Sequence, residues 1–193
     1  RPVTLAVARP GVTALYRADG LLGAQPALTA LQRLGYAVTV AASWDEFNGL
    51  LATNTYLLAV ALNHNSASNG VDLNAVSNHL AAGRRALVVD AAKRPSVGAL
   101  LHATYEGADN QNPVYISEPE LAMGVTNPLP LQNVGYTRWS WGATPTGSAE
   151  SLAEFPAGAS AVVWGNSGRS ALVNFKADAV RRCRGRRAGR RTG

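Results

Sequence analysis

The sequence predicts an α/β fold: a three-layer, flavodoxin-like, doubly wound and mostly parallel sheet, with a β-rich irregular C-terminal part. Three observations support it. The runs 56–62 and 86–89 are apolar without polar alternation, which is typical of strands covered on both faces. The segment between them has helical apolar spacing and the length of a crossover, so the two strands are expected to be parallel. Strand and helix patterns also alternate before residue 52.

The first elements follow from local patterns. Residues 3–8 form a short β-rich run, and the apolar spacing over 27–34 predicts a helix that ends at Gly35. A strand is expected over 37–42. The tetrapeptide 43–46, Ser-Trp-Asp-Glu, has the spacing of a capping box, in which the Ser hydroxyl and the Glu carboxylate accept from helix-start amides.

The central unit has the strongest pattern. Apolar residues recur at helical spacing over 73–81, Asp72 is the expected N-cap, and Gly83 is the expected stop. A short helix is expected over 96–102. Beyond it the chain contains a polar stretch over 106–113 and then β-type runs interrupted by Pro and Gly.

The chain is expected to close with a hairpin. Its strands are the apolar runs 161–164 and 170–175, and the turn is Gly165-Asn166-Ser167-Gly168.

The positive charge is concentrated at one end. The formal net charge is +6, but the last 13 residues contain seven arginines: Arg181, Arg182, Arg184, Arg186, Arg187, Arg190 and Arg191. Without them 11 basic residues remain against 12 acidic ones, which leaves −1. We therefore expect an α/β domain over 1–178 and an Arg-rich, disordered tail over 179–193, with a nucleic-acid-binding arm as the alternative for the tail.

Composition bears on location and partners. Abundant Asn, Ser, Thr and Gly with only two lysines, Lys93 and Lys176, favour a secreted or periplasmic protein, and a first residue of Arg1 is compatible with a removed leader. No apolar stretch approaches the roughly 20 residues that span a bilayer, so no membrane partner is expected.

Several kinds of site have no motif here. The sequence lacks GxGxxG, GxxxxGK[ST] and GxSxG, so no cofactor is expected. The only cysteine, Cys183, lies in the Arg-rich tail, and neither His79 nor His102 has a second histidine at ligand spacing, so no metal site is expected.

Three segments resemble the class I glutamine amidotransferase-like superfamily, particularly its non-amidotransferase branches such as ThuA-like domains and β-galactosidase trimerisation domains. They are 72–90, which contains LNAVSNHLAAGRRALVVD, with LQRLGYAVTV at 31–40 and GRSALVNF at 168–175. The resemblance implies the flavodoxin-like fold. Catalytic members place a Cys on the strained turn after the strand matching 86–89 and a His after the final strand. Here these positions are 90–93, Asp-Ala-Ala-Lys, and 175–178, Phe-Lys-Ala-Asp, which supply neither group and argue against that chemistry.

The carboxyl ends of the strands are the expected ligand-binding edge. Polar residues follow three strands there: Arg9, Arg17 and Asp19 after the first, Asn63, His64, Asn65 and Ser66 after the third, and Asp90 after the fourth. His64 can act as a general base oriented by Asp90, or bind a sugar hydroxyl. The structural alternative is that these residues are turn formers and caps.

The aromatic segment YTRWSW is the expected interface. Tyr136 has the opposite strand parity to Trp139 and Trp141, so in a regular strand at least one ring faces solvent or a partner. The alternative is that the rings, with Trp164, fill the core of the C-terminal half. Glu118 and Glu120 are a weaker candidate for a catalytic carboxylate pair.

Three functions remain open from these observations. The preferred one is a non-catalytic amidotransferase-like module that mediates protein association, including self-association, or binds a carbohydrate or other ligand. The second is a hydrolase-type enzyme that uses His64 and Asp90. The third is nucleic-acid binding through Arg181–Arg191.

Overall fold

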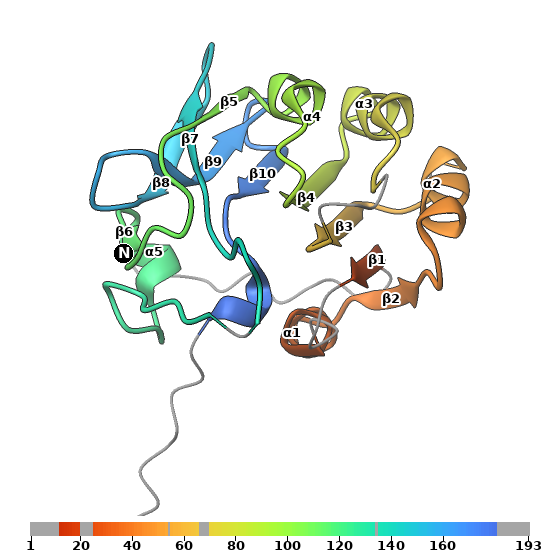
Figure 1. Cartoon of the computed structure of the whole chain (residues 1–193). Helices are drawn as coiled ribbons and strands as arrows, with labels where there is room; N and C mark the ends of the chain where they lie inside the picture. Colours follow the sequence, from red (N-terminus) through yellow and green to blue (C-terminus); the bar gives the residue numbers. More distant parts are fainter. Residues whose placement is uncertain (1–11, 20–24, 54, 66–69, 134, 181–193) are drawn as a thin grey trace, which may run out of the picture.

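The structure is a computed structural model that describes residues 12–19, 25–53, 55–65, 70–133 and 135–180. Its strands form one open sheet in the order β2-β1-β3-β4-β10-β9-β7-β5, with β8 paired to β9 and β6 paired to β8. The α/β class expected from the sequence is confirmed. The sheet has a parallel half and an antiparallel half (Figure 1).

The parallel half has the strand order of a flavodoxin-like sheet. Its strands are β1 (Thr13–Asp19), β2 (Ala37–Val40), β3 (Leu58–Asn63), β4 (Arg85–Asp90) and β10 (Ser170–Val173). From β1 the chain moves outward to β2, and it then returns to add β3 and β4 on the other side of β1. The order therefore reverses between β1 and β3, and open α/β sheets bind ligands at the carboxyl ends of the strands at such a point.

The antiparallel half begins at β10. Its strands are β5 (Ala103–Glu106), β6 (Tyr115–Ile116), β7 (Gly142–Pro145), β8 (Glu150–Glu154) and β9 (Ser160–Gly165). The expected closing hairpin is confirmed, because β9 and β10 pair antiparallel. β10 thus joins the halves, being parallel to β4 on one edge and antiparallel to β9 on the other.

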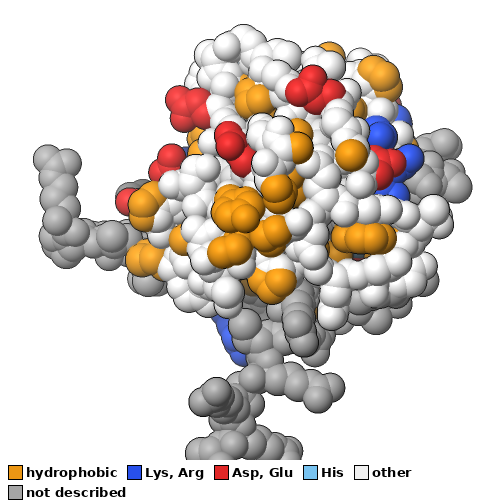
Figure 2. All heavy atoms as spheres, turned by 60° about the vertical axis from the view of Figure 1, so that its left-hand side comes forward, with side chains coloured by type: hydrophobic (Ala, Val, Ile, Leu, Met, Phe, Trp, Pro, Cys, Tyr) orange, Lys and Arg blue, Asp and Glu red, His pale blue; other side chains and the backbone are white. Residues whose placement is uncertain are grey.

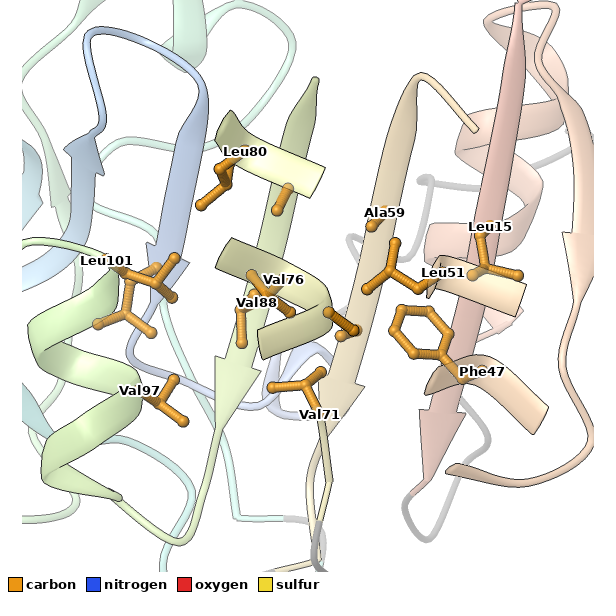
Figure 3. Packing of buried hydrophobic residues seen from close by; sticks show 14 of the residues in the cluster. Leu15, Phe47, Leu51, Ala59, Val71, Val76, Leu80, Val88, Val97 and Leu101 are labelled. Atoms are coloured by element: carbon orange, nitrogen blue, oxygen red, sulfur yellow. The ribbon is translucent and has the colours of Figure 1, made fainter. Parts of the chain in front are cut away.

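The helices cover the two faces of the sheet unequally. α2 (Trp44–Ala52), α3 (Leu73–Ala81) and α4 (Pro95–Leu100) lie in a row along one face, and α1 (Gln25–Arg33) lies on the other (Figure 1). The core under the row of three is continuous from Leu15 and Phe47 to Leu101 and Leu172, as Figure 3 shows for its central part. On the α1 face, Trp141 completes the second core beside Val89.

Side-chain caps fix the helix starts that the sequence predicted. Ser43 precedes α2 and its Oγ accepts from the Glu46 amide at 3.0 Å. Glu46 reaches back to the amide of Ala42, one residue before the N-cap, and accepts there instead of from the Ser43 amide of a standard capping box. Asp72 precedes α3 and accepts from the Ala75 amide at 2.7 Å. Both predicted caps are therefore confirmed.

Arg17 and Asp19 lie within a strand and not after one. We expected Arg17 and Asp19 to follow a strand over Val3–Ala8, but they lie in β1, Thr13–Asp19. Val3–Ala8 lies outside the described residues. The apolar run of β1 has only three residues, 14–16, before Arg17, which is too short to predict a strand.

Two C-terminal expectations also change. Residues 135–140 form no strand, so the parity argument for Tyr136, Trp139 and Trp141 does not apply. Ala179, expected to begin the tail, is the fully buried last residue of the 3-10 helix η1 (Ala177–Ala179), and Val180 forms a bridge with Leu131. Residues 181–193, including Cys183, lie outside the described residues. Within the described part, no helix has the length and apolarity needed to cross a membrane.

Candidate functional site

Three polar residues stand side by side at the carboxyl edge of the parallel strands. The register pairs Asp19 of β1 with Asn63 of β3, and Asn63 with Asp90 of β4. Each is the last residue of its strand. The chain thus brings together the strand ends that the sequence predicted, at the point where the strand order reverses.

Asp19 fixes the segment that follows β3. Its Oδ1 accepts from the amides of His64 at 2.6 Å and Asn65 at 3.1 Å, and its Oδ2 accepts from the Trp44 indole at 2.9 Å. The carboxylate therefore ties α2 and the end of β3 to β1. Arg17 stabilises the same edge, because it donates to the Ala42 carbonyl at 2.8 Å and its guanidinium lies 5.7 Å from the centre of the Trp44 ring.

His64 lies fully buried between two segments. The Ala177 amide donates to its Nε2 at 3.3 Å, so the proton of the neutral ring is assigned to Nδ1. Nδ1 lies 3.5 Å from Asp178 Oδ2. Burial lowers the pKa of His64 more than the nearby carboxylates of Asp178 and Asp19 raise it, so the neutral imidazole is favoured.

The expected pairing of His64 with Asp90 is not formed. The carboxylate beside the His64 ring belongs to Asp178, and Asp90 binds Arg94 instead, accepting from its amide at 2.8 Å and from its Nε at 3.0 Å. Asp90 is fully buried and also accepts from Asn63 at 3.5 Å and Tyr105 at 3.4 Å. Burial and this carboxylate raise the pKa of Tyr105. Asp90 therefore organises the start of α4.

A tyrosine and a lysine complete the group around His64. Tyr136 donates to Asp178 Oδ2 at 2.7 Å, and its ring meets the His64 ring edge-on at 6.4 Å. Lys176 is 5% exposed and its ammonium lies 3.6 Å from the centre of the Tyr136 ring. We call His64, Tyr136, Lys176 and Asp178 the strand-end cluster.

The turn after β4 has an unusual backbone. Lys93 occupies the left-handed region with φ of 53°, which non-glycine residues rarely adopt. Its ammonium pairs with Asp109 at 3.0 Å, and Arg138 pairs with the same carboxylate at 2.6 Å. Burial raises the pKa of Asp109, but hydrogen bonds and charge from Lys93 and Arg138 outweigh that effect and hold it below its ordinary value. Asp109 thus ties the turn after β4 to Arg138.

A pocket of about 450 Å³ opens beside this turn, between α4, β5 and the end of β7. It is lined by Lys93, Pro95, Ala99, Ala103, Thr104, Tyr105 and Thr146. Most of these side chains are apolar or carry a hydroxyl group. Asp19, Asn63, His64 and Asp90 do not line the pocket, but Tyr105, which donates to Asp90, does.

The remaining predicted residues are dispersed. Asn65 is exposed, while Arg9 and Ser66 lie outside the described residues. His79 is fully buried in α3 and bonds the Arg85 carbonyl at 3.0 Å, and His102 follows α4. Within the described residues no group of three or more His, Cys, Asp and Glu is arranged to hold a metal ion.

The aromatic residues expected at an interface are mostly covered. Trp141 is fully buried, as the alternative of a core role for these rings predicts. Tyr136 and Trp139 are partly buried. Trp164, which the sequence left as a core candidate, is 37% exposed, but most of the exposed apolar side chains of the C-terminal half lie in another segment. Tyr115, Leu121, Met123 and Val125 are 46–53% exposed, within one segment formed by β6, α5 (Pro119–Ala122) and the turn that follows.

We call these four residues the β6–α5 patch. Figure 2 shows apolar side chains gathered on this face with acidic side chains near them. Glu118 and Glu120 are exposed within the segment, and Glu154 lies opposite Tyr115 in the β6–β8 pair. α5 buries none of its residues, and about half of each of the four patch side chains is exposed.

The comparisons with known proteins add one distant likeness. No protein-family model and no curated protein matches the chain. Among solved structures, the chain is similar to one titled "Crystal structure of SMU.1228c", with a TM-score of 0.49 and 12% identity over 85% of this chain and 75% of that one.

Proposed function

We propose that this chain is a non-catalytic, amidotransferase-like α/β module that associates with a protein partner through the β6–α5 patch. The observation that carries the proposal is the helix α5, which buries none of its residues, with Leu121 in the helix and Met123 directly after it exposed by 51% and 53%. Contiguous apolar surface of this kind is typical of interaction sites.

The strand ends support the non-catalytic part of the proposal. His64 and Asp90 are fully buried and are bonded to different protein groups, so they form no accessible acid–base pair. The turn that carries the nucleophile in catalytic amidotransferases has Lys93 at its left-handed position, with its ammonium held by Asp109. The buried groups here bind one another and organise the loops.

Charge indicates what kind of partner fits the patch. Glu118, Glu120 and Glu154 lie beside it, and none forms an ion pair with another described residue. A symmetric contact between two copies would bring these carboxylates face to face, and anionic lipid or nucleic acid would be repelled. The complementary partner is therefore a polypeptide surface with apolar side chains flanked by Lys or Arg.

Binding of a defined probe tests this proposal. A labelled amphipathic helical peptide of Leu and Lys should bind the chain in fluorescence anisotropy, and the same peptide with Glu in place of Lys should not. Leu121→Ser should weaken binding about tenfold, because the lost apolar burial is on the order of 1.5 kcal/mol. Charge reversal at Glu118 and Glu120 should mainly slow association.

A matched variant gives the control. Leu34 is 50% exposed but follows α1 on the parallel half, so Leu34→Ser should leave binding unchanged. Equal weakening by both variants would contradict a role for the patch. Sedimentation of the free chain and flotation with anionic vesicles would detect self-association or lipid binding, and either result would overturn the choice of partner.

A further inference from the structure

Lys176 is the side chain at the strand ends whose surroundings differ most from those of an ordinary surface lysine. It is 5% exposed and follows β10, and its ammonium lies on the face of the Tyr136 ring. No described residue accepts a hydrogen bond from its Nζ or forms an ion pair with it. A side chain with three donors is thus largely withdrawn from water without a protein acceptor, although its Nζ is not among the fully buried unbonded atoms.

The neighbours of Lys176 favour its neutral amine. Burial and, to a smaller extent, the positive charge of Arg138 lower the pKa of Lys176 to about 8, against the opposing effect of the Asp19 and Asp178 carboxylates. Desolvation and a nearby cation are the two means by which proteins activate a lysine as a nucleophile. About a tenth of the side chain is therefore uncharged at pH 7, far more than for an ordinary lysine.

Proton-carrying groups surround the amine in a connected arrangement. Tyr136 contacts Lys176 through its ring and donates its hydroxyl proton to Asp178, which also lies beside the His64 imidazole. Two of the neighbours of the amine, Tyr136 and Arg138, are only half-buried. Lys176 thus combines a nucleophilic nitrogen with phenol, carboxyl and imidazole groups at the carboxyl edge of the sheet.

We propose that Lys176 is a covalent binding site for a small aldehyde or ketone, which it holds as an imine at the strand-end cluster. The amine nitrogen attacks the carbonyl carbon and forms the C–N bond. The carbonyl oxygen leaves as water with the two hydrogens that the amine nitrogen loses, so no oxidant or other co-reactant is needed. The site is separate from the β6–α5 patch and does not depend on the proposed association.

Reductive trapping tests the proposal on the unmodified chain. Limiting glyoxylate with sodium cyanoborohydride at pH 7.5 converts an imine into a stable carboxymethyl amine, which peptide mass spectrometry locates. The chain has only two lysines, so Lys93, paired with Asp109, is an internal reference. Lys176 should be modified at least about tenfold faster than Lys93 in the native chain, and the ratio should approach one in urea.

The pH profile and two variants sharpen the result. The trapping rate at Lys176 should rise with pH and have its midpoint near the pKa of about 8. Lys93→Arg should leave trapping at Lys176 unchanged, and Lys176→Arg should abolish the specific product while keeping the positive charge. Modification of Lys176 no faster than Lys93, or an unchanged ratio after unfolding, would overturn the proposal.

Discussion

Gly70 shows how closely the chain is packed around the strand-end residues. It has φ of +61°, and a Cβ atom there would lie 2.5 Å from Asn63 Nδ2 and 2.7 Å from Arg94 Nη2. Those two side chains also bond Asp90, so they cannot both move away without loss. At this position glycine is needed for its backbone conformation and also for the space it leaves.

Gly70→Ala should therefore lower the free energy of unfolding by more than the backbone cost alone. We expect about 2–4 kcal/mol from left-handed strain and crowding together. Gly83→Ala is the matched control, because Gly83 has φ of +79° but no atom within 4 Å of the added methyl group. It should cost about 1–2 kcal/mol. Urea denaturation measures the unfolding free energy of both variants. Equal losses would show that Asn63 and Arg94 move aside for the added methyl group at Gly70 without cost.

His64 makes the stability of the fold depend on pH. Its pKa is lowered by burial from an ordinary value of 6.5, so below pH 6.5 the unfolded chain binds a proton that the folded chain does not. Stability should therefore be full above pH 6.5 and fall as the pH drops toward the folded pKa. His79 is buried and has a lowered pKa as well, so it should contribute in the same direction.

Replacing these histidines separates their contributions. His64→Gln should make the fall in unfolding free energy between pH 7 and pH 5 shallower, His79→Gln should do likewise, and the double variant should be nearly flat in this window. Urea denaturation at several pH values measures the slope. A slope that steepens with His64→Gln would mean that the folded ring is protonated, contrary to the geometry at Ala177 and Asp178.

The site was predictable only where local patterns mark it. Asn63, His64 and Asp90 stand where apolar runs end, so their place at the carboxyl edge followed from the sequence. The partner of His64 did not, because Asp178 lies more than 100 positions away in a short segment after β10 with no periodicity. Local patterns mark strand ends but do not say which distant segment folds back onto them.

At the scale of elements, the helix caps are specific and testable. Ser43→Ala removes the acceptor for the Glu46 amide at the start of α2 and should lower the unfolding free energy by about 1 kcal/mol. Ser43→Asp keeps an acceptor at the same position and should cost much less. Thermal or urea unfolding measures the difference. Equal losses from both variants would show that the Ser43 hydroxyl does not stabilise the helix start.

The elements that the sequence predicted well are those with a clear local pattern of apolar residues. β3 and β4 are continuous apolar runs, and α2 and α3 have both an apolar face and a capping residue. β1 was missed because Arg17 interrupts its apolar residues, although this side chain is satisfied by the Ala42 carbonyl. The strands between β5 and β8 are two to five residues long, too short for a period to be distinguished from a turn.

At the scale of the whole molecule, one core connects the two halves of the sheet. The same cluster contains Leu15 and Phe47 of the parallel half and Ala143 and Val163 of the antiparallel half, with Leu172 of the junction strand β10 between them. A continuous core favours cooperative unfolding of both halves. The described residues are therefore expected to unfold as one domain. This expectation rests on the shared core, because a sheet with a parallel and an antiparallel half could also consist of two units.

Leu172→Ala should test this unity, because the side chain is fully buried at the junction. We expect a loss of about 2–5 kcal/mol in unfolding free energy from the lost contacts and the cavity. Hydrogen exchange followed by mass spectrometry should show the amides of β3 and β4 accelerated by the same factor as those of β7 and β9, since both open only with the shared core. Leu121→Ala, at an exposed position, should change neither rate by more than about twofold. Faster exchange confined to the antiparallel strands would mean that the halves unfold separately, with β10 staying attached to β4.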